Sequence, residues 1–170
     1  MLLAVLSVAQ SRTMYIGDVE LHLGMSREAV MKALTPRYNV AALGESSFTV
    51  TQYDPTQKLH NLLGSIGFDN NQLSFINRSI DTSGWPNDEG YAVGRAIYDG
   101  ISGSIPVTDS DDAKRAAARI VISSDDTSRP RGNMKTIDIY INDRKITVVV
   151  FDADGSKGVN ASVAIRAKPW

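Results

Sequence analysis

The chain lacks cysteine and any long apolar run, and these two absences exclude several classes of protein. Without cysteine there can be no disulfide framework, no thiolate zinc site and no thiol nucleophile. A membrane-spanning helix needs about 20 consecutive apolar residues, and no segment of the 170 residues supplies them. We therefore predict no integral membrane segment and a fold that is held together by side-chain packing alone.

An excess of charge of one sign is also missing. The 18 lysines and arginines nearly balance the 19 aspartates and glutamates, so the formal net charge is -1. Proteins that bind nucleic acids or anionic membranes present a strongly basic surface, because their partners are polyanions. The composition therefore argues against nucleic acid as a partner.

Residues that commonly carry catalysis are few. The only histidines are His22 and His60, and neither has another histidine or a glutamate at helical spacing. Asp152 and Asp154 precede a glycine, as in a calcium loop, but Val163 stands where that loop needs a glutamate. Nucleophile-elbow and phosphate-loop spacings are absent. We predict no catalytic residue, no cofactor and no metal site, and hence no enzyme. The alternative is a small hydrolase or metal-dependent enzyme whose site is dispersed over aspartates and serines.

The first ten residues have the composition of a secretion signal. Residues 1–10 are uncharged and mostly apolar, and Ser7 and Ala9 stand at the small-residue positions that precede a signal-peptidase cut. We interpret residues 1–10 as the remnant of a signal peptide, the alternative being an edge strand or a frayed end. This predicts an extracytoplasmic protein, periplasmic or secreted, without a membrane span.

Residues 11–170 are predicted to form a single domain with two halves, 20–81 and 88–168. In the first half, Ser26 can cap a short helix that ends before Pro36. Strands are predicted around Phe48 to Tyr53 and on both sides of a polar turn at residues 69–71.

The second half is predicted to begin with a helix of about residues 88–104, whose buried face carries Val93, Ile97 and Ile101. Alternating apolar residues then predict strands within 119–123, 135–141, 146–151 and 163–167. The fold class that we predict is α+β, an antiparallel meander sheet with the two main helices packed on one face. Both halves would share the order of a helix followed by strands.

The first half resembles a known family. Leu23 to Ser26, followed by Glu28 and Val30, and the later segment from Ile66 to Leu73 are similar to small outer-membrane lipoprotein domains of the SmpA/OmlA type. That fold group also includes β-lactamase inhibitory proteins. The resemblance covers residues 21–81 and implies a non-enzymatic, extracytoplasmic module that binds other proteins. Since the lipidation cysteine of that family is missing, membrane attachment does not carry over, and no functional residue transfers.

Three aromatic residues are the candidate protein-binding residues, namely Trp85, Tyr53 and Tyr140. A tryptophan in a loop can anchor a partner, although it more often folds back over the core. The function predicted from the sequence is an exported protein-binding or envelope-assembly module whose partner is another protein. An inhibitor of a secreted enzyme is the alternative within the same non-catalytic class.

Overall fold

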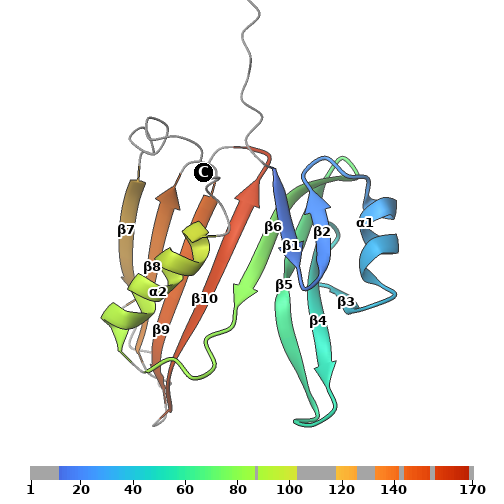
Figure 1. Cartoon of the computed structure of the whole chain (residues 1–170). Helices are drawn as coiled ribbons and strands as arrows, with labels where there is room; N and C mark the ends of the chain where they lie inside the picture. The colour runs from blue at the N-terminus through green and yellow to red at the C-terminus, as the bar shows by residue number, and fades with distance from the viewer. Residues whose placement is uncertain are drawn as a thin grey trace, which may run out of the picture.

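An eight-stranded antiparallel sheet dominates the computed structural model (Figure 1), which describes residues 12–86, 88–102, 118–125, 133–141, 144–153 and 156–168. A separate two-stranded hairpin and two helices complete it. The elements in chain order are β1 (Thr13–Ile16), β2 (Val19–His22), α1 (Arg27–Leu34), β3 (Asn39–Ala42), β4 (Ser47–Asp54), β5 (Leu59–Asp69), β6 (Gln72–Ile80), α2 (Glu89–Ser102), β7 (Ala118–Asp125), β8 (Asn133–Ile141), β9 (Arg144–Ala153) and β10 (Ser156–Arg166).

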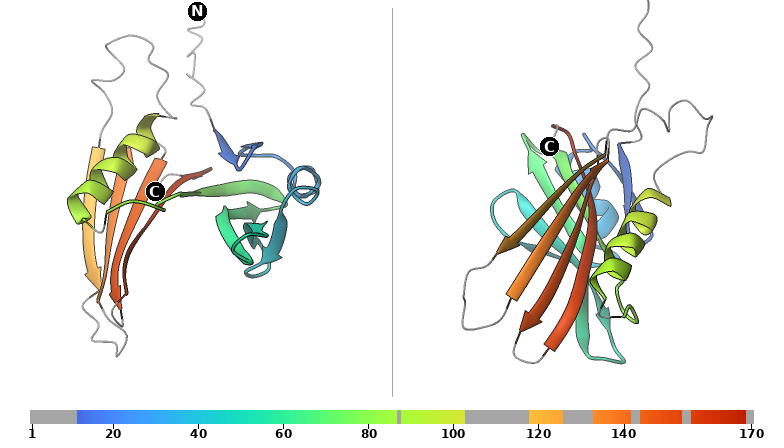
Figure 2. Two further views of the ribbon diagram at one scale, coloured as in Figure 1. Left: turned by 60° about the horizontal axis from the view of Figure 1, so that its bottom comes forward. Right: turned by 90° about the vertical axis from the view of Figure 1, so that its left-hand side faces the viewer.

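The large sheet consists of two four-stranded meanders that meet at its centre. The strand order is β3-β4-β5-β6-β10-β9-β8-β7, so the last strand of each meander pairs with the last strand of the other. In the β6–β10 pair, Ile76 lies opposite Ile165. Each meander follows a helix in the chain, α1 before β3 and α2 before β7. The sheet curves strongly from one meander to the other (Figure 2).

The predicted α+β class was wrong. Strands account for 59% of the structure and helices for 16%, so the protein is mostly antiparallel β sheet with two small helices and not a balanced α+β packing. The meander sheet is also not continuous along the chain, because β6 pairs with β10 rather than with β7, the next strand in the sequence. The physical reason is strand length. Strands β5 and β10 each have 11 residues, whereas α1 has only 8, so short helices cover only part of the apolar surface that these strands present.

One face of the large sheet is covered, and we call it the covered face. It carries the buried side chains that alternate along the strands, and these form one cluster with the β1–β2 hairpin and both helices. Ile76 and Ile165 are completely buried where the two meanders meet. Helix α2 contacts β9 and β10, and the hairpin contacts β6 through β1. Among the described side chains, hydrophobic burial on this face therefore extends from β4 across the centre of the sheet to β8.

The helix and turn predicted in the first half are confirmed. The Ser26 side chain accepts a hydrogen bond from the backbone N–H of Ala29 at the start of α1. Asn70 and Asn71 both have positive φ between β5 and β6, as a tight hairpin turn requires. The backbone N–H of Arg27 donates to the carbonyl of Asn71 at 2.9 Å. This contact fastens the start of α1 to the hairpin turn.

Candidate functional site

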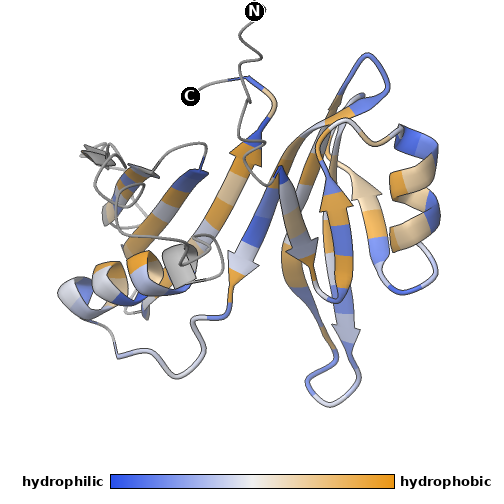
Figure 3. Ribbon diagram, turned by 45° about the horizontal axis from the view of Figure 1, so that its top comes forward, coloured by the Kyte–Doolittle hydropathy of each residue, from blue (hydrophilic) through white to orange (hydrophobic). Residues whose placement is uncertain are grey.

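The other face of the large sheet, which we call the open face, has no helix or strand packed on it within the described part of the chain. Its side chains are those that alternate with the buried ones, and most of them are half-buried. Hydrophobic and hydrophilic residues accordingly alternate along several strands (Figure 3). Small hydroxyl and amide side chains prevail near the centre, including Ser79, Ser162 and Asn77. An antiparallel sheet commonly leaves one such face in contact with water.

A hollow of about 940 Å³ lies on the open face where the two meanders meet. The residues that line it come from β4, β5, β6, β9, β10 and the segment that follows β6; they include Leu62, Asn77, Trp85, Phe151, Asn160 and Ser162. Because these strands are distant in sequence, only the pairing of β6 with β10 brings the lining together. A concave site of this size is a typical place for a ligand or a partner's side chains.

Charged groups on the open face of the second meander neutralise each other. Lys145 Nζ lies 2.9 Å from one carboxylate oxygen of Asp138, and the Thr147 hydroxyl donates to the other at 2.7 Å. The side chains of Lys145 and Asp138 are only 24% and 18% exposed. The ammonium group also lies 5.7 Å from the ring centre of Tyr140, within the range of a cation–π contact. This part of the face therefore offers a partner a preorganised polar surface with little net charge.

Tyr140, predicted as a binding residue, belongs to this polar surface and is half-buried. Tyr53, the second predicted residue, lies near the end of β4 with 52% of its surface exposed. Its ring centre is 5.2 Å from that of His60 on β5. Neither tyrosine lines the hollow.

Trp85, the third predicted residue, lies in the segment between β6 and α2 and is half-buried. It packs against the core cluster, and its ring meets that of Tyr91 edge-on at 6.2 Å. It also lines the hollow. Both interpretations of this tryptophan, a cover for the core and an anchor for a partner, are therefore compatible with its position.

Sequence reasoning missed most of the residues that line the hollow, such as Phe151 and Asn160. A signal for them was present, since each alternates with a residue of the buried row. The alternating pattern predicts which residues point away from the core, however, and not which of them lie next to one another on neighbouring strands.

The two histidines have neighbours that are not carboxylates. The Nδ1 atom of His22 lies 2.7 Å from the hydroxyl of Thr13, while His60 contacts the ring of Tyr53. Across the ranges that the structure describes, no three residues among histidine, aspartate and glutamate form a group that could hold a metal ion. Residues 109–112, 126 and 154 of the acidic runs considered from the sequence lie outside those ranges.

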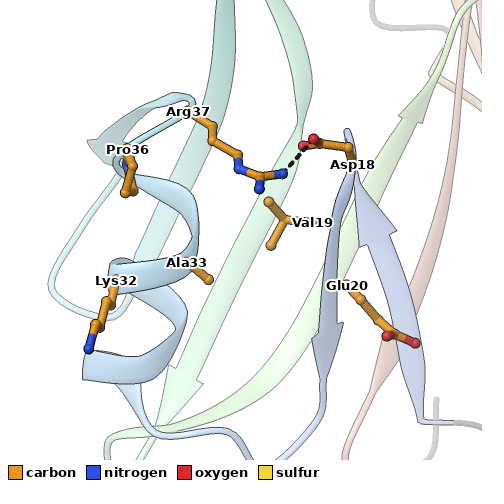
Figure 4. A pocket seen from close by; sticks show the side chains of 7 residues that line it. All are labelled: Asp18, Val19, Glu20, Lys32, Ala33, Pro36 and Arg37. Atoms are coloured by element: carbon orange, nitrogen blue, oxygen red, sulfur yellow. Dashed lines mark hydrogen bonds and ion pairs between the residues drawn. The ribbon is translucent and has the colours of Figure 1, made fainter.

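A second hollow, of about 480 Å³, lies between the β1–β2 hairpin and α1 (Figure 4). Asp18 forms an ion pair with Arg37 there and accepts a hydrogen bond from the Tyr38 hydroxyl at 2.5 Å. The hydrogen bonds from Tyr38 and Arg37 lower the pKa of Asp18, and the bond to Asp18 raises the pKa of Tyr38. These groups satisfy one another, so we assign them the role of joining the hairpin to the chain that follows α1.

No family model, no curated protein and no solved structure matches this chain. The resemblance to the SmpA/OmlA type therefore stays a prediction. Neither helix of the described ranges is long and apolar enough to cross a membrane.

Proposed function

We propose that this chain is a non-catalytic protein-binding module that receives its partner on the open face. The observation that carries the proposal is the hollow of about 940 Å³ at the meeting point of the two meanders. The sequence features that predict export extend the proposal to an extracytoplasmic protein, such as an envelope-assembly module.

The chemistry of the open face supports a protein as the partner. Asp81 is the only charged residue among the described residues that line the hollow, and aromatic groups such as Phe151 and Trp85 stand among hydroxyl and amide side chains. The core of a protein interface is likewise depleted in charged residues and enriched in aromatic ones. An acidic or basic ligand would find little charge here to pair with.

A pair of matched variants tests this proposal. Asn160 is an exposed residue that lines the hollow, and Ala29 is an exposed residue of α1, on the covered side. Asn160→Arg and Ala29→Arg place the same charged side chain on opposite sides of the molecule. The immobilised wild-type chain and each variant would be used to capture proteins from extracts of the source cell.

We expect Asn160→Arg to reduce partner capture by about tenfold or more, which corresponds to about 1.4 kcal/mol of binding free energy. Ala29→Arg should capture as much as wild type. Equal capture by the two variants would contradict binding on the open face. Capture of no specific protein by the wild-type chain would count against the binding function itself.

A further inference from the structure

Strand β5 extends well beyond the strand that pairs with it on one side. It pairs with β4 along almost its full length, from Leu59 to Gly67, but with β6 only from Gly64 to Asp69. In the described residues, no strand pairs with Leu59–Leu63 on the side of β6. Figure 1 shows β5 and β10 diverging below the end of β6. The backbone of these five residues therefore presents an unpaired strand edge.

The separation of β5 from β6 begins beyond a close contact between the two strands. At Gly64 a Cβ atom would lie 2.1 Å from the carbonyl oxygen of Asn77, so only glycine fits the close crossing of the two strands. A register shift in β5 occurs at the same level, opposite Val50 and Thr51. Beyond this point β6 follows β10 instead, with Ser79 opposite Ser162. The space beside residues 59–63 of β5 is therefore not filled by β6.

This space belongs to the hollow of about 940 Å³ on the open face. Leu62 and Leu63 line it on the β5 side, and Val159 and Asn160 line it on the β10 side. Asn160 belongs to the open face and Val159 to the buried row. Since residues of both rows line the hollow, it extends into the plane of the sheet between the two strands.

The two strand edges that border the hollow differ in their hydrogen bonds within the described structure. On β10, the carbonyl oxygen of Val159 accepts a hydrogen bond of 2.7 Å from the Thr82 hydroxyl. On β5, Leu59 and Leu62 are 57% and 53% exposed, and residues 59–63 contain neither lysine nor proline. Proteins normally protect exposed edges with such residues, because an open edge pairs readily with another chain.

We infer that the edge of β5 at Leu59–Leu63 receives an extended, uncharged segment of a partner protein as an added strand. This inference rests on the proposed binding function and specifies its mode. Five residues of strand span about 16 Å, and the added backbone would pair with β5 through main-chain hydrogen bonds. Apolar side chains of the segment would lie against Leu62, Leu63 and Trp85, and the nearly uncharged lining disfavours a charged segment.

The experiment begins with a phage-displayed library of random 12-residue peptides, selected on the full chain. The best peptide is then synthesised in two further forms, with N-methyl groups on alternate backbone nitrogens in each of two phases. N-methylation removes hydrogen-bond donors while leaving the side chains unchanged. Because alternate residues of a strand direct their N–H groups to opposite sides, we expect one phase to weaken binding by about tenfold or more and the other by less than about threefold.

Matched variants locate the site. Leu62→Lys places a protective charge on the edge, and Leu43→Lys places the same charge on a residue that is 66% exposed and outside the hollow. We expect Leu62→Lys to weaken peptide binding by about tenfold and Leu43→Lys to leave it unchanged. Both leucines are exposed, so neither variant should unfold the protein.

Other outcomes overturn strand addition, and they separate it from the proposed function. Suppose that Asn160→Arg weakens peptide binding but Leu62→Lys and both methylation phases do not. Binding on the open face would then be supported, and strand addition at β5 would be contradicted. Failure of the library to give any binder overturns strand addition, whereas the capture experiment tests the wider function independently. If wild type forms a dimer in sedimentation that Leu62→Lys abolishes, the occupant of the edge is a second copy of this chain and not a partner's segment.

Discussion

The covered and open faces of the same sheet are made by the same strands, yet they differ in nearly every physical property. On the covered face, Ile76 and Ile165 pack without exposure beneath a hairpin and two helices. On the open face, the half-buried Asn77 and Ser162 line a hollow that no helix or strand of the described residues covers. The difference teaches that one period-two pattern can encode stability on one side of a sheet and recognition on the other.

The largest effect is expected from a comparison of adjacent residues. Ile76→Ala removes a completely buried side chain and should lower the free energy of unfolding by about 2–5 kcal/mol. Asn77→Ala, one residue further on the opposite face, should change it by less than about 0.5 kcal/mol, since the side-chain oxygen of Asn77 is buried without a hydrogen-bond partner. Urea denaturation of both variants measures the difference, and similar losses would abolish the distinction between the faces.

The next effect concerns the place where β5 leaves β6. Gly64→Ala introduces a Cβ atom against the carbonyl of Asn77 and should destabilise the protein by about 2 kcal/mol. Gly94→Ala is the control, because nothing lies within 4 Å of its added Cβ on α2 and alanine favours a helix by about 1 kcal/mol. Thermal unfolding should therefore shift in opposite directions. A neutral Gly64→Ala would mean that the close contact between the two strands relaxes without cost.

A smaller change in the free energy of unfolding is expected from the N-cap of α1, which lies over the covered face. Ser26→Ala removes the cap of α1 and should cost about 1 kcal/mol. Ser26→Asp keeps an acceptor at the same position and should retain most of the stability. If chemical denaturation finds the two variants equal, the cap does not help to hold α1 over the sheet.

The smallest effect is the dependence of stability on pH at the junction of the hairpin and α1. The pKa of Asp18 lies below its ordinary value of 3.8, so its contribution to stability is present above that pH. This contribution disappears as the pH falls below 3.8 and through the lowered pKa, because protonation weakens the bonds from Tyr38 and Arg37. Asp18→Asn should therefore lower the melting temperature slightly at pH 7 and less at pH 3. An equal loss at both pH values would show that the charge of Asp18 is irrelevant.

Sequence reasoning succeeded where local chemistry decides the conformation. The cap at Ser26 and the turn at Asn70 and Asn71 depend on residues adjacent in the chain, and both are confirmed. It was less successful for α2, where Ala92 and Ala96 are completely buried while Val93 and Ile97 are half-buried. The reason is that the helix lies close to β9 and β10, so the smallest residues face the sheet.

Other elements could not be found from the sequence because their residues do not alternate. Residues 59–63 lie outside the strands predicted from the sequence but form the start of β5, because pairing with β4 extends the strand beyond the core. Strand β3 was missed for a similar reason, since three of its four residues are exposed and leave no buried row to detect. The missed part of β5 forms one wall of the hollow, so this wall was missed with it.

Local residue types by themselves determined the alternation of buried residues in the strands that were predicted, where α1 begins and where β5 turns into β6. These features depend on spacing and on hydrogen bonds between near neighbours. Only the tertiary structure decided that β6 would pair with β10, that β5 would keep an unpaired edge, and that a hollow would lie between them. Strand pairing joins residues more than 80 positions apart, and a local alternating pattern fits many such partners equally well.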